Sequence, residues 1–455
     1  MAVAIATIAW STLAVGGVYV WATVPIVALG VLLAILARPR VARRSDTRPL
    51  DVTLLVGLAA LAFQLLPLPN RVRWLLSPRV DVDRMELLLM PDAATSWRPL
   101  SLDPHATGVA LAVASAAVLV FWSCRSICGH GHTRPLVRAV AVVGLVAAVA
   151  AVVQRAVAPE LIYGIWPPAD AGARPFGPFV NRNHFATWLL MAVPLTAGAL
   201  VASAGARRPS GRLSPEIAAG LRAIGSVDGW IGVSSAAMML TLILTSSRSG
   251  LGAAAVTVVT AFGLSARRLS RRGLVVSIGA AALVAATAAW ITSPQPILAR
   301  VQETLSLGSA GRADIWQDAT TVFKAYPWTG TGVGTFERSM LVYQATDRSV
   351  RTNQAHNQYL QVAAEGGLLL IVPILAVCAA FARLAWRRFF EDASPSGWLR
   401  IGSLAGLVGV AVQSVWETGL RMPGNLVLFA VVAAIAVHRP MGRRKETVVD
   451  LGRSA

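Results

Sequence analysis

The sequence predicts an all-α polytopic membrane protein with about twelve transmembrane helices and one large, partly helical periplasmic loop. Of its 455 residues, 55% are hydrophobic and 14% are charged, whereas an ordinary soluble domain has roughly 25% charged residues. The apolar residues form runs close to the roughly 20 residues that a membrane-spanning helix needs. The arginines gather in the short segments between these runs. Both patterns are typical of a chain that crosses a membrane many times.

The first part of the chain is predicted to contain nine helices. Residues 2–37 carry no charge and are long enough for two short helices, with a turn near Gly16 and Gly17. The other seven are expected at about 50–66, 105–123, 137–157, 185–204, 230–245, 250–264 and 274–291. Two loops separate them, near 67–104 and 158–184. The first loop mixes acidic, basic and apolar residues, which indicates an extramembrane segment with a helix at the membrane interface.

The longest polar interruption of the chain follows the ninth helix. Within it, the residues from Asp314 to Lys324 have the apolar periodicity of a helix. Three more membrane helices are expected at about 362–382, 401–417 and 422–437. The predicted divisions are nine helices in 1–291, the large loop in 292–361, three helices in 362–438 and a basic tail in 439–455.

The distribution of basic residues predicts which segments face the cytoplasm. With both chain termini inside, arginine and lysine are densest in the short inside segments, as the positive-inside rule requires. Most acidic residues then fall in the longer segments on the other side. This orientation places residues 158–184, the turn at Arg248 and the large loop on one side of the membrane, away from the cytoplasm. The net charge of +19 is explained by cytoplasmic loops, so nucleic acid is not expected as a partner.

Arg248 is the most informative single residue. It lies in the short turn TSSRSG at 245–250, between two apolar helices. An ionisable group at this depth usually faces a polar cavity or a partner. The surrounding serines add hydrogen-bond donors, and this combination suits an anion such as phosphate. The alternative is an arginine that reaches from a helix end to the membrane surface.

Two further residues of the large loop carry candidate chemistry. Arg312 comes just before a predicted helix, whose N-terminus can bind an anion; its alternative role is an ion pair with Asp314 or Asp318. His356 lies just before the tenth helix and can accept a proton near neutral pH. Its alternative role is an ordinary hydrogen bond at the interface.

Two other patterns are interpreted structurally. Residues 329–334, TGTGVG, lack the spacing of a dinucleotide-binding loop, so a flexible turn beneath a substrate is expected there. Cys124, Cys128, His130 and His132 are residue types that can bind metal. Because the cysteines continue an apolar helix, no metal site is predicted, and the three cysteines indicate no disulfide framework.

Four stretches of the sequence resemble the O-antigen ligase and O-antigen polymerase family of bacterial envelope glycosyltransferases. The stretches are FGPFVNRNHFA at 176–186, TSSRSG at 245–250, GRADIW at 311–316 with PWTGTGVG at 327–334, and AHNQYLQVAAEGG at 355–367. The resemblance covers about 158–375, and the first four helices match in general character alone. Each motif is short, but their order and their shared predicted face make the combination specific.

The resemblance implies a GT-C-like glycosyltransferase of the bacterial inner membrane. It implies an undecaprenyl-pyrophosphate-linked glycan as donor, lipid A-core or another glycan as acceptor, and membrane lipid as surroundings. It also implies a metal-independent enzyme without a cofactor. By motif, the implied catalytic residues are Arg248, Arg312 and His356. The pyrophosphate-binding candidates are Arg248, Arg312 and Arg182, and the secondary candidates are Asn183, Asn357 and Asp314.

Arginines can supply the positive charge that a lipid pyrophosphate leaving group needs. His356 can act as general base on an acceptor hydroxyl or hydrogen-bond a phosphate, and the sequence does not separate these roles. A single displacement with inversion is expected because no paired-carboxylate nucleophile is evident. Ligase, polymerase and protein-glycosylating activities stay open, with ligase preferred. The alternatives of another class are a transporter or flippase of a lipid-linked or anionic solute, and a non-catalytic assembly subunit.

Overall fold

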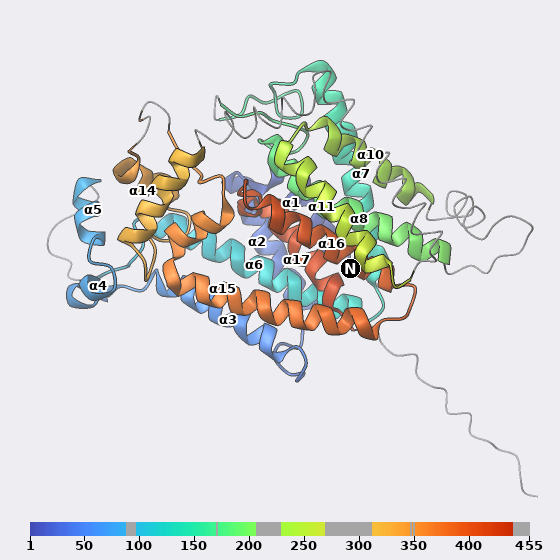
Figure 1. The fold of residues 1–455 in the computed structure, drawn as a ribbon, viewed down its shortest axis with the longest axis horizontal. Coiled ribbons are helices and arrows are strands. Elements are labelled where there is room, and N and C mark those ends of the chain that lie inside the picture. The colour runs from blue at the N-terminus through green and yellow to red at the C-terminus, as the bar shows by residue number, and fades with distance from the viewer. Residues whose placement is uncertain are drawn as a thin grey trace, which may run out of the picture.

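The chain forms a bundle of long helices with a smaller group of short elements at one end (Figure 1). In the computed structural model, residues 1–87, 97–169, 172–205, 229–268, 312–345, 348 and 351–439 are described. The predicted helix at 274–291, the first part of the large loop and nearly all of the basic tail lie outside these residues. Their predictions therefore stay predictions.

The predicted helices of the described part are all present. The turn expected near Gly16 and Gly17 is a 3-10 turn, η1 (Val15–Gly17), and both glycines have positive φ. The apolar helices in the first part of the chain are α1 (Ala2–Leu13), α2 (Val20–Ala37), α3 (Arg48–Phe63), α6 (Pro104–Gly129), α7 (Thr133–Val157), α8 (Arg182–Gly205), α10 (Gly229–Leu244) and α11 (Arg248–Ser265). The C-terminal helices are α15 (Gln358–Glu391), α16 (Gly397–Gln413) and α17 (Pro423–Val437). The structure thus agrees with the predicted order of helices outside 274–291.

Several of these helices are suited to cross a membrane. Among the described residues, five helices are long and apolar enough by length and composition: Val20–Ala37, Pro104–Gly129, Thr133–Val157, Arg182–Ser203 and Gln358–Glu391. Shorter apolar helices accompany them at Ala2–Leu13, Gly229–Leu244, Gly397–Gln413 and Pro423–Val437. The protein is therefore a helical membrane protein, as its composition predicts.

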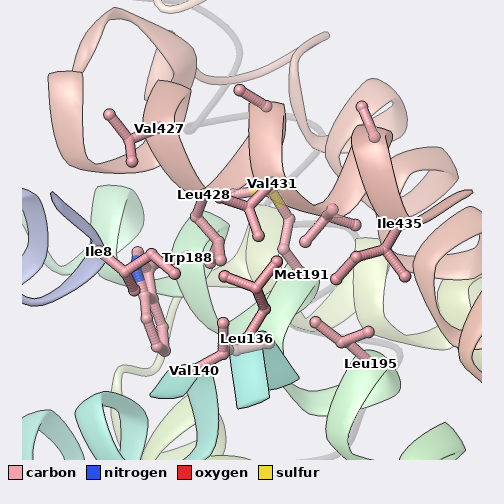
Figure 2. Close-up of a cluster of buried hydrophobic side chains, with 14 of the residues drawn as sticks. Ile8, Leu136, Val140, Trp188, Met191, Leu195, Val427, Leu428, Val431 and Ile435 are labelled. Atoms are coloured by element: carbon pink, nitrogen blue, oxygen red, sulfur yellow. The ribbon is translucent and has the colours of Figure 1, made fainter. Parts of the chain in front are cut away.

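The main core surrounds α8, which packs against α7, α10, α16 and α17. Figure 2 shows Trp188 and Met191 of α8 in contact with side chains of α7 and α17. Small residues allow close helix contacts: a Cβ added at Gly402 would lie 2.0 Å from the carbonyl oxygen of Pro194. Close approach of helix backbones at small residues is common in membrane proteins, where packing contacts drive helix association. The tight packing of α16 on α8 fixes the end of α16 beside the first turn of α8.

Cys124 and Cys128 are buried in α6, which is longer than predicted, and they face the main core. His130 and His132 follow at the exposed end of the helix. The two cysteines are buried and the two histidines are exposed, which agrees with the interpretation of Cys124 and Cys128 as apolar helix residues.

A second, smaller core joins the loop near 67–104 to the large loop at 292–361, and we call this part of the molecule the cap. It contains β1 (Leu68–Pro69) paired antiparallel with β2 (Trp97–Arg98), α4 (Asn70–Leu76), α5 (Val80–Glu86), a helix at 312–325 and α14 (Phe336–Tyr343). Its buried side chains include Val80, Tyr326 and Phe336. The Tyr326 hydroxyl donates to Asp83 Oδ2 at 2.6 Å. Burial, and the bond to Asp83, raise the pKa of Tyr326, so the hydroxyl keeps the proton that links the two loops.

The glycine-rich stretch at 327–334 is a turn whose backbone is hydrogen-bonded to α15, and the expectation of a substrate above it stays a prediction. Helix α15 is broken at Gly367, which has φ 55 and ψ −161. The turn supplies the missing backbone partners: Gly332 N–H donates to the Glu365 carbonyl at 2.9 Å, and Leu368 N–H donates to the Pro327 carbonyl at 2.8 Å. Gln64, just after α3, donates to the carbonyls of Thr329 and Glu365. The turn therefore completes the broken helix, because buried backbone groups need partners.

Gly330→Ala is expected to lower the free energy of unfolding by about 1–3 kcal/mol, as overpacking of a filled site does. Gly330 has φ +64, and an added Cβ would lie 2.2 Å from the backbone of Glu365. The measurement is thermal unfolding of the purified protein in detergent. Gly108→Ala is the matched control, because no atom lies within 4 Å of the Cβ added there. Equal melting temperatures for the two variants would contradict a packed turn.

Candidate functional site

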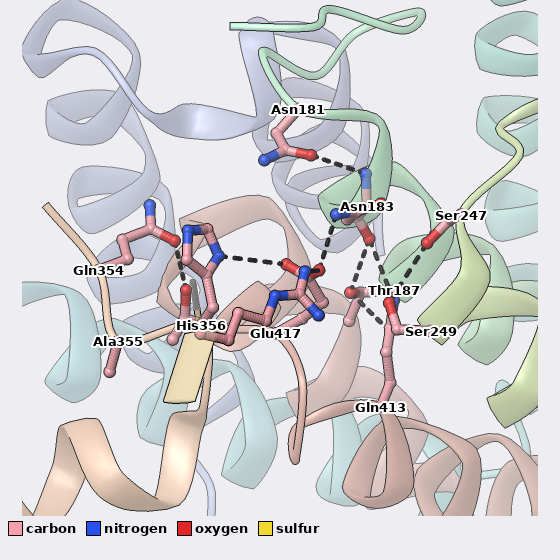
Figure 3. Close-up of polar contacts among 12 residues, drawn as sticks. Asn181, Asn183, Thr187, Ser247, Ser249, Gln354, Ala355, His356, Gln413 and Glu417 are labelled. Carbon is pink, nitrogen blue, oxygen red and sulfur yellow. Dashed lines mark hydrogen bonds and ion pairs between the residues drawn. The ribbon is translucent and has the colours of Figure 1, made fainter. Parts of the chain in front are cut away.

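A buried carboxylate brings three of the predicted site residues together. Glu417 lies between α16 and the 3-10 turn η2 (Gly419–Arg421), and its side chain is 1% exposed. Its Oε1 accepts hydrogen bonds from Asn183 Nδ2 at 2.7 Å and Arg312 Nη2 at 3.1 Å. Its Oε2 lies 3.9 Å from His356 Nδ1. Figure 3 shows the Asn183, His356 and Glu417 side chains pointing toward one another from different segments of the chain.

The first turn of α8 positions Asn183. The Asn183 N–H donates to Asn181 Oδ1 at 2.8 Å, and Gln413 Nε2, at the end of α16, donates to the Asn183 carbonyl at 3.2 Å. Thr187 Oγ1 in turn donates to Gln413 Oε1 at 2.8 Å. These bonds hold the start of α8 against the end of α16, where Glu417 follows. The secondary candidate Asn183 is thus part of the Glu417 cluster.

The cap positions Arg312. This residue begins the helix at 312–325, and its side chain is 32% exposed. Trp316 Nε1 donates to the carbonyl of Ala355 at 3.0 Å, so the same helix is fastened to the residue before His356. The partner that the structure gives Arg312 is Glu417. Asp314 is exposed and makes no hydrogen bond or ion pair with another described residue, so the structure does not bring this secondary candidate into the cluster.

His356 occupies an unusual backbone conformation next to a helix cap. Its φ is 48, in the left-handed region that residues other than glycine rarely adopt. Such strain is often found at functional sites. Asn357 caps α15: its side-chain oxygen accepts from the N–H groups of Tyr359 and Leu360, both at 3.0 Å. The secondary candidate Asn357 therefore has a structural role, which is to start the helix and so fix the position of His356.

Arg248 lies beside this cluster but makes no contact with Glu417. It is the first residue of α11, where Ser247 caps the helix by accepting from Gly250 N–H at 3.1 Å. An added Cβ at Gly250 would lie 2.8 Å from the Cβ of Ala186, so this helix start touches the first turns of α8. Figure 3 shows the Ser247 and Ser249 side chains near Gln413. Arg248 is exposed and has no hydrogen bond or ion pair with a described residue.

Arg182 is the second arginine at this end of α8. Its backbone N–H donates to the Arg174 carbonyl at 3.0 Å, which brings these two basic residues together. Its half-buried side chain makes no hydrogen bond or ion pair within the described part of the chain. Arg182 and Arg248 are therefore positive groups without a directly paired carboxylate in the described part of the chain, next to a helix N-terminus, and Glu417 attracts Arg182 at longer range. Such a place attracts an anion.

Sequence reasoning missed Glu417, His184 and Arg421. Four buried polar atoms of these residues and of His356 have no hydrogen-bond partner in the described structure: Glu417 Oε2, His356 Nδ1, His184 Nε2 and Arg421 Nη1. Such atoms are rare in folded proteins, and a hydroxyl-bearing ligand can satisfy them. One signal could have identified Glu417. It is an acidic residue at the end of an apolar helix in a segment predicted to be periplasmic, where an ionisable group marks a functional site.

Glu417→Gln is expected to lower the rate of the reaction at this site by about 100-fold or more, because the carboxylate lies against both His356 and Arg312. In a His356→Ala background the same change is expected to add little, since residues acting as one unit have non-additive effects. The measurement is the initial rate of each single and double variant. Asp314→Asn is the matched control, because it removes a carboxylate from an exposed position of the same cap. Additive losses in the double variant would contradict a shared role.

The fold and the site together define a helical membrane protein with a polar, arginine-rich site at one end of its helices. The O-antigen ligase family model matches residues 233–375, from α10 into α15, and includes Arg248, Arg312 and His356. This match supports the predicted resemblance to the O-antigen ligase and polymerase family. The family acts in glycan assembly as membrane glycosyltransferases of ligase or polymerase type, with lipid-linked glycan and acceptor substrates. Among curated proteins, no sequence matches the chain.

Proposed function

We propose that this protein transfers a glycan from an undecaprenyl-pyrophosphate carrier to an acceptor hydroxyl on the periplasmic face of the bacterial inner membrane. The observation that carries the proposal is the convergence of Arg312, Asn183 and His356 on the buried carboxylate of Glu417. This arrangement holds a base and a cation side by side. Unpaired arginines lie on the adjacent helix starts.

We assign Arg248 and Arg182 to bind the donor pyrophosphate, and Arg312 to contact the edge of the bound pyrophosphate. Neither Arg248 nor Arg182 forms a direct ion pair or side-chain hydrogen bond with a described carboxylate, so their guanidinium groups can donate hydrogen bonds to a ligand. Arginine suits phosphate because its planar guanidinium donates two parallel hydrogen bonds. Three arginines can compensate the charge of the departing pyrophosphate without a metal ion. Helix α11 starts at Arg248, so this arginine lies at the end of an apolar helix. A donor whose pyrophosphate binds there can keep its prenyl tail in the membrane.

His356 is assigned as the general base. Glu417 Oε2 lies on the Nδ1 side of the imidazole, which favours a proton on Nδ1 and leaves Nε2 free to accept one. The distance of 3.9 Å is longer than a hydrogen bond, and such contacts often tighten when substrate binds. Nε2 takes the acceptor proton, and the acceptor oxygen bonds to the anomeric carbon. The bond from that carbon to the pyrophosphate breaks, and its electron pair leaves with the lipid pyrophosphate, which inverts the anomeric centre.

The charge distribution of the two ends supports a periplasmic site. At the end remote from Glu417, Arg125 pairs with Asp51 at 2.7 Å, and α15 ends in a basic run at 387–388. Dense arginine at the end of the bundle away from the site is expected for the cytoplasmic side. Tyr359 and Trp416 are exposed close to the site, as aromatic residues at the opposite interface would be.

The acceptor separates two candidate activities of the same family. A ligase uses lipid A-core or a related glycan, and a polymerase uses a second carrier-linked repeat. We prefer the ligase from the sequence motifs. A transporter is less well supported, because transporters usually place their polar site near the middle of the membrane. Glu417, His356 and Arg248 lie instead at helix ends and turns.

The test supplies the purified full chain with lipid-linked glycan and separate acceptors, in the presence of a metal chelator. Product analysis by mass spectrometry and NMR is expected to show transfer with an inverted linkage. Transfer to lipid A-core identifies a ligase, and a lengthened carrier-linked glycan identifies a polymerase. A strict divalent-metal requirement, a retained linkage or a trapped glycosyl-enzyme would rule out the mechanism. Movement of glycan across vesicles without transfer would indicate a transporter.

A further inference from the structure

A polar cavity lies at the end of the helix bundle remote from Glu417. It encloses about 460 Å³, within the roughly 300–1,000 Å³ of pockets that bind small ligands. Three segments distant in the sequence form it: the connection from α2 to α3, the last turns of α15, and the residue after His438. In Figure 1 these segments meet at the C-terminal end of α15. The lining residues are Arg44, Ser45, Asp46, Arg387, Arg388, Glu391 and Arg439.

The cavity has more positive charge than it needs for its own ion pairs. Four arginines and two carboxylates line it, which leaves a net charge of +2. Arg388, with a side chain 7% exposed, pairs with Asp46 and with Glu391 Oε2 at 3.0 Å. Its Nε is buried without a hydrogen-bond partner. The two carboxylates are thus occupied at the buried wall of the cavity.

Arg44 and Arg439 carry the excess positive charge of the lining. Both are exposed, and neither side chain makes a hydrogen bond or a close ion pair with another described residue, although Asp46 attracts Arg439 at longer range. They come from opposite ends of the chain, yet they line the same cavity. Two such guanidinium groups facing one space are suited to a doubly coordinated phosphate.

The surroundings of the cavity indicate that it opens at the level of lipid headgroups. Trp386 and Phe390, on the same turns of α15, are 63% and 46% exposed, and their ring centroids lie 4.6 Å apart. Arg267 lies over the Phe390 ring at 4.4 Å. Earlier turns of α15 expose Val372 and Leu375. Exposed tryptophan between an apolar helix surface and a basic segment is typical of the membrane interface.

We propose that this cavity binds the phosphate-bearing headgroup of an anionic phospholipid. Arg44 and Arg439 contact the phosphate, while Asp46 and Glu391 hold Arg388 and Arg387 in place. Basic pockets between membrane helices on the cytoplasmic side bind such headgroups in other proteins. A bound lipid links the connection before α3 to the ends of α15 and α17. A ligand that binds the folded state and not the unfolded state stabilises the folded state. The bound lipid therefore raises the free energy of unfolding of these helices.

The test measures binding of phosphatidylglycerol and phosphatidylcholine to the purified full chain by native mass spectrometry, with thermal unfolding in parallel. Phosphatidylglycerol is expected to bind more tightly and to raise the melting temperature. The double variant Arg44→Gln/Arg439→Gln is expected to bind it roughly 30-fold more weakly. Both residues are exposed, and each single variant is prepared as well, so that a folding defect is recognised. The assay needs no glycan transfer.

The control variant Arg38→Gln/Arg40→Gln removes the same charge from exposed residues of the same basic segment that do not line the cavity. It is expected to bind phosphatidylglycerol within about twofold of the wild type. Equal weakening by both double variants would overturn the site and indicate a diffuse charge effect. Equal binding of the two lipids would also overturn it. Inorganic phosphate that protects the protein where phosphatidylglycerol does not would identify a free anion instead of a lipid as the ligand.

Discussion

Arg248→Ala is expected to lower the rate of glycan transfer by about 10²–10³-fold, the loss that follows removal of one group stabilising transition-state charge. Arg248 is exposed at the start of α11 and has no carboxylate partner among the described residues. Its removal therefore breaks no ion pair of the folded protein. The loss of its charge affects the step in which the pyrophosphate leaves. The measurement is the initial rate with lipid-linked donor and saturating acceptor.

The conservative variant Arg248→Lys tests the chemistry of this charge. Lysine keeps the positive charge but cannot donate two parallel hydrogen bonds, so its rate is expected to lie between those of the wild type and Arg248→Ala. Arg71→Ala is the control, because Arg71 is exposed in α4 of the cap and takes no part in the cluster. Protein abundance and membrane insertion are measured for all variants. If abundance falls as much as activity, Arg248 has a folding role and the assignment is wrong.

His356→Gln is expected to lower kcat by about 10²–10⁴-fold, the usual contribution of a general base. The KM for the donor is expected to change little, because the arginines that bind pyrophosphate are retained. The physical reason is the position of Glu417 beside Nδ1, which prepares Nε2 to take the acceptor proton.

Two further observations distinguish a base from a phosphate ligand at His356. Added imidazole is expected to restore part of the activity of His356→Ala, since a free base can occupy the vacated space. His105→Gln is the control, because His105 is exposed at the start of α6, away from Glu417. A variant that raises the donor KM with kcat unchanged would assign His356 to phosphate binding.

The order of the helices follows from the sequence because it depends on local composition. Apolar runs of sufficient length must bury their backbone polar groups in helices when they meet a membrane. The predicted positions of the apolar helices therefore agree with the structure in the described part, even where the ends of α6 and α15 extend further. Arg248, Arg312 and His356 were also identifiable, because each stands out as a polar residue at the end of an apolar run.

The glycine-rich turn shows where local reasoning fails. Its composition predicts flexibility, since glycine adopts many conformations. In the structure, Gly330 and Gly332 use positive φ to reach the backbone of α15 where that helix is broken at Gly367. The sequence separation of the two segments hides this contact. Flexibility of the isolated residues and rigidity of the folded turn are both consequences of the absent Cβ.

By itself, the sequence determined the helical membrane class, the positions of the apolar helices and the polar residues that resemble the O-antigen ligase family. Only the tertiary structure decided that Glu417 joins Asn183, Arg312 and His356, that Asn357 caps a helix, and that Asp314 stays outside. The physical reason is the range of the interactions. Hydrophobic burial is encoded in neighbouring residues, whereas a buried carboxylate acquires its partners from whichever segments the helix packing brings within hydrogen-bond distance.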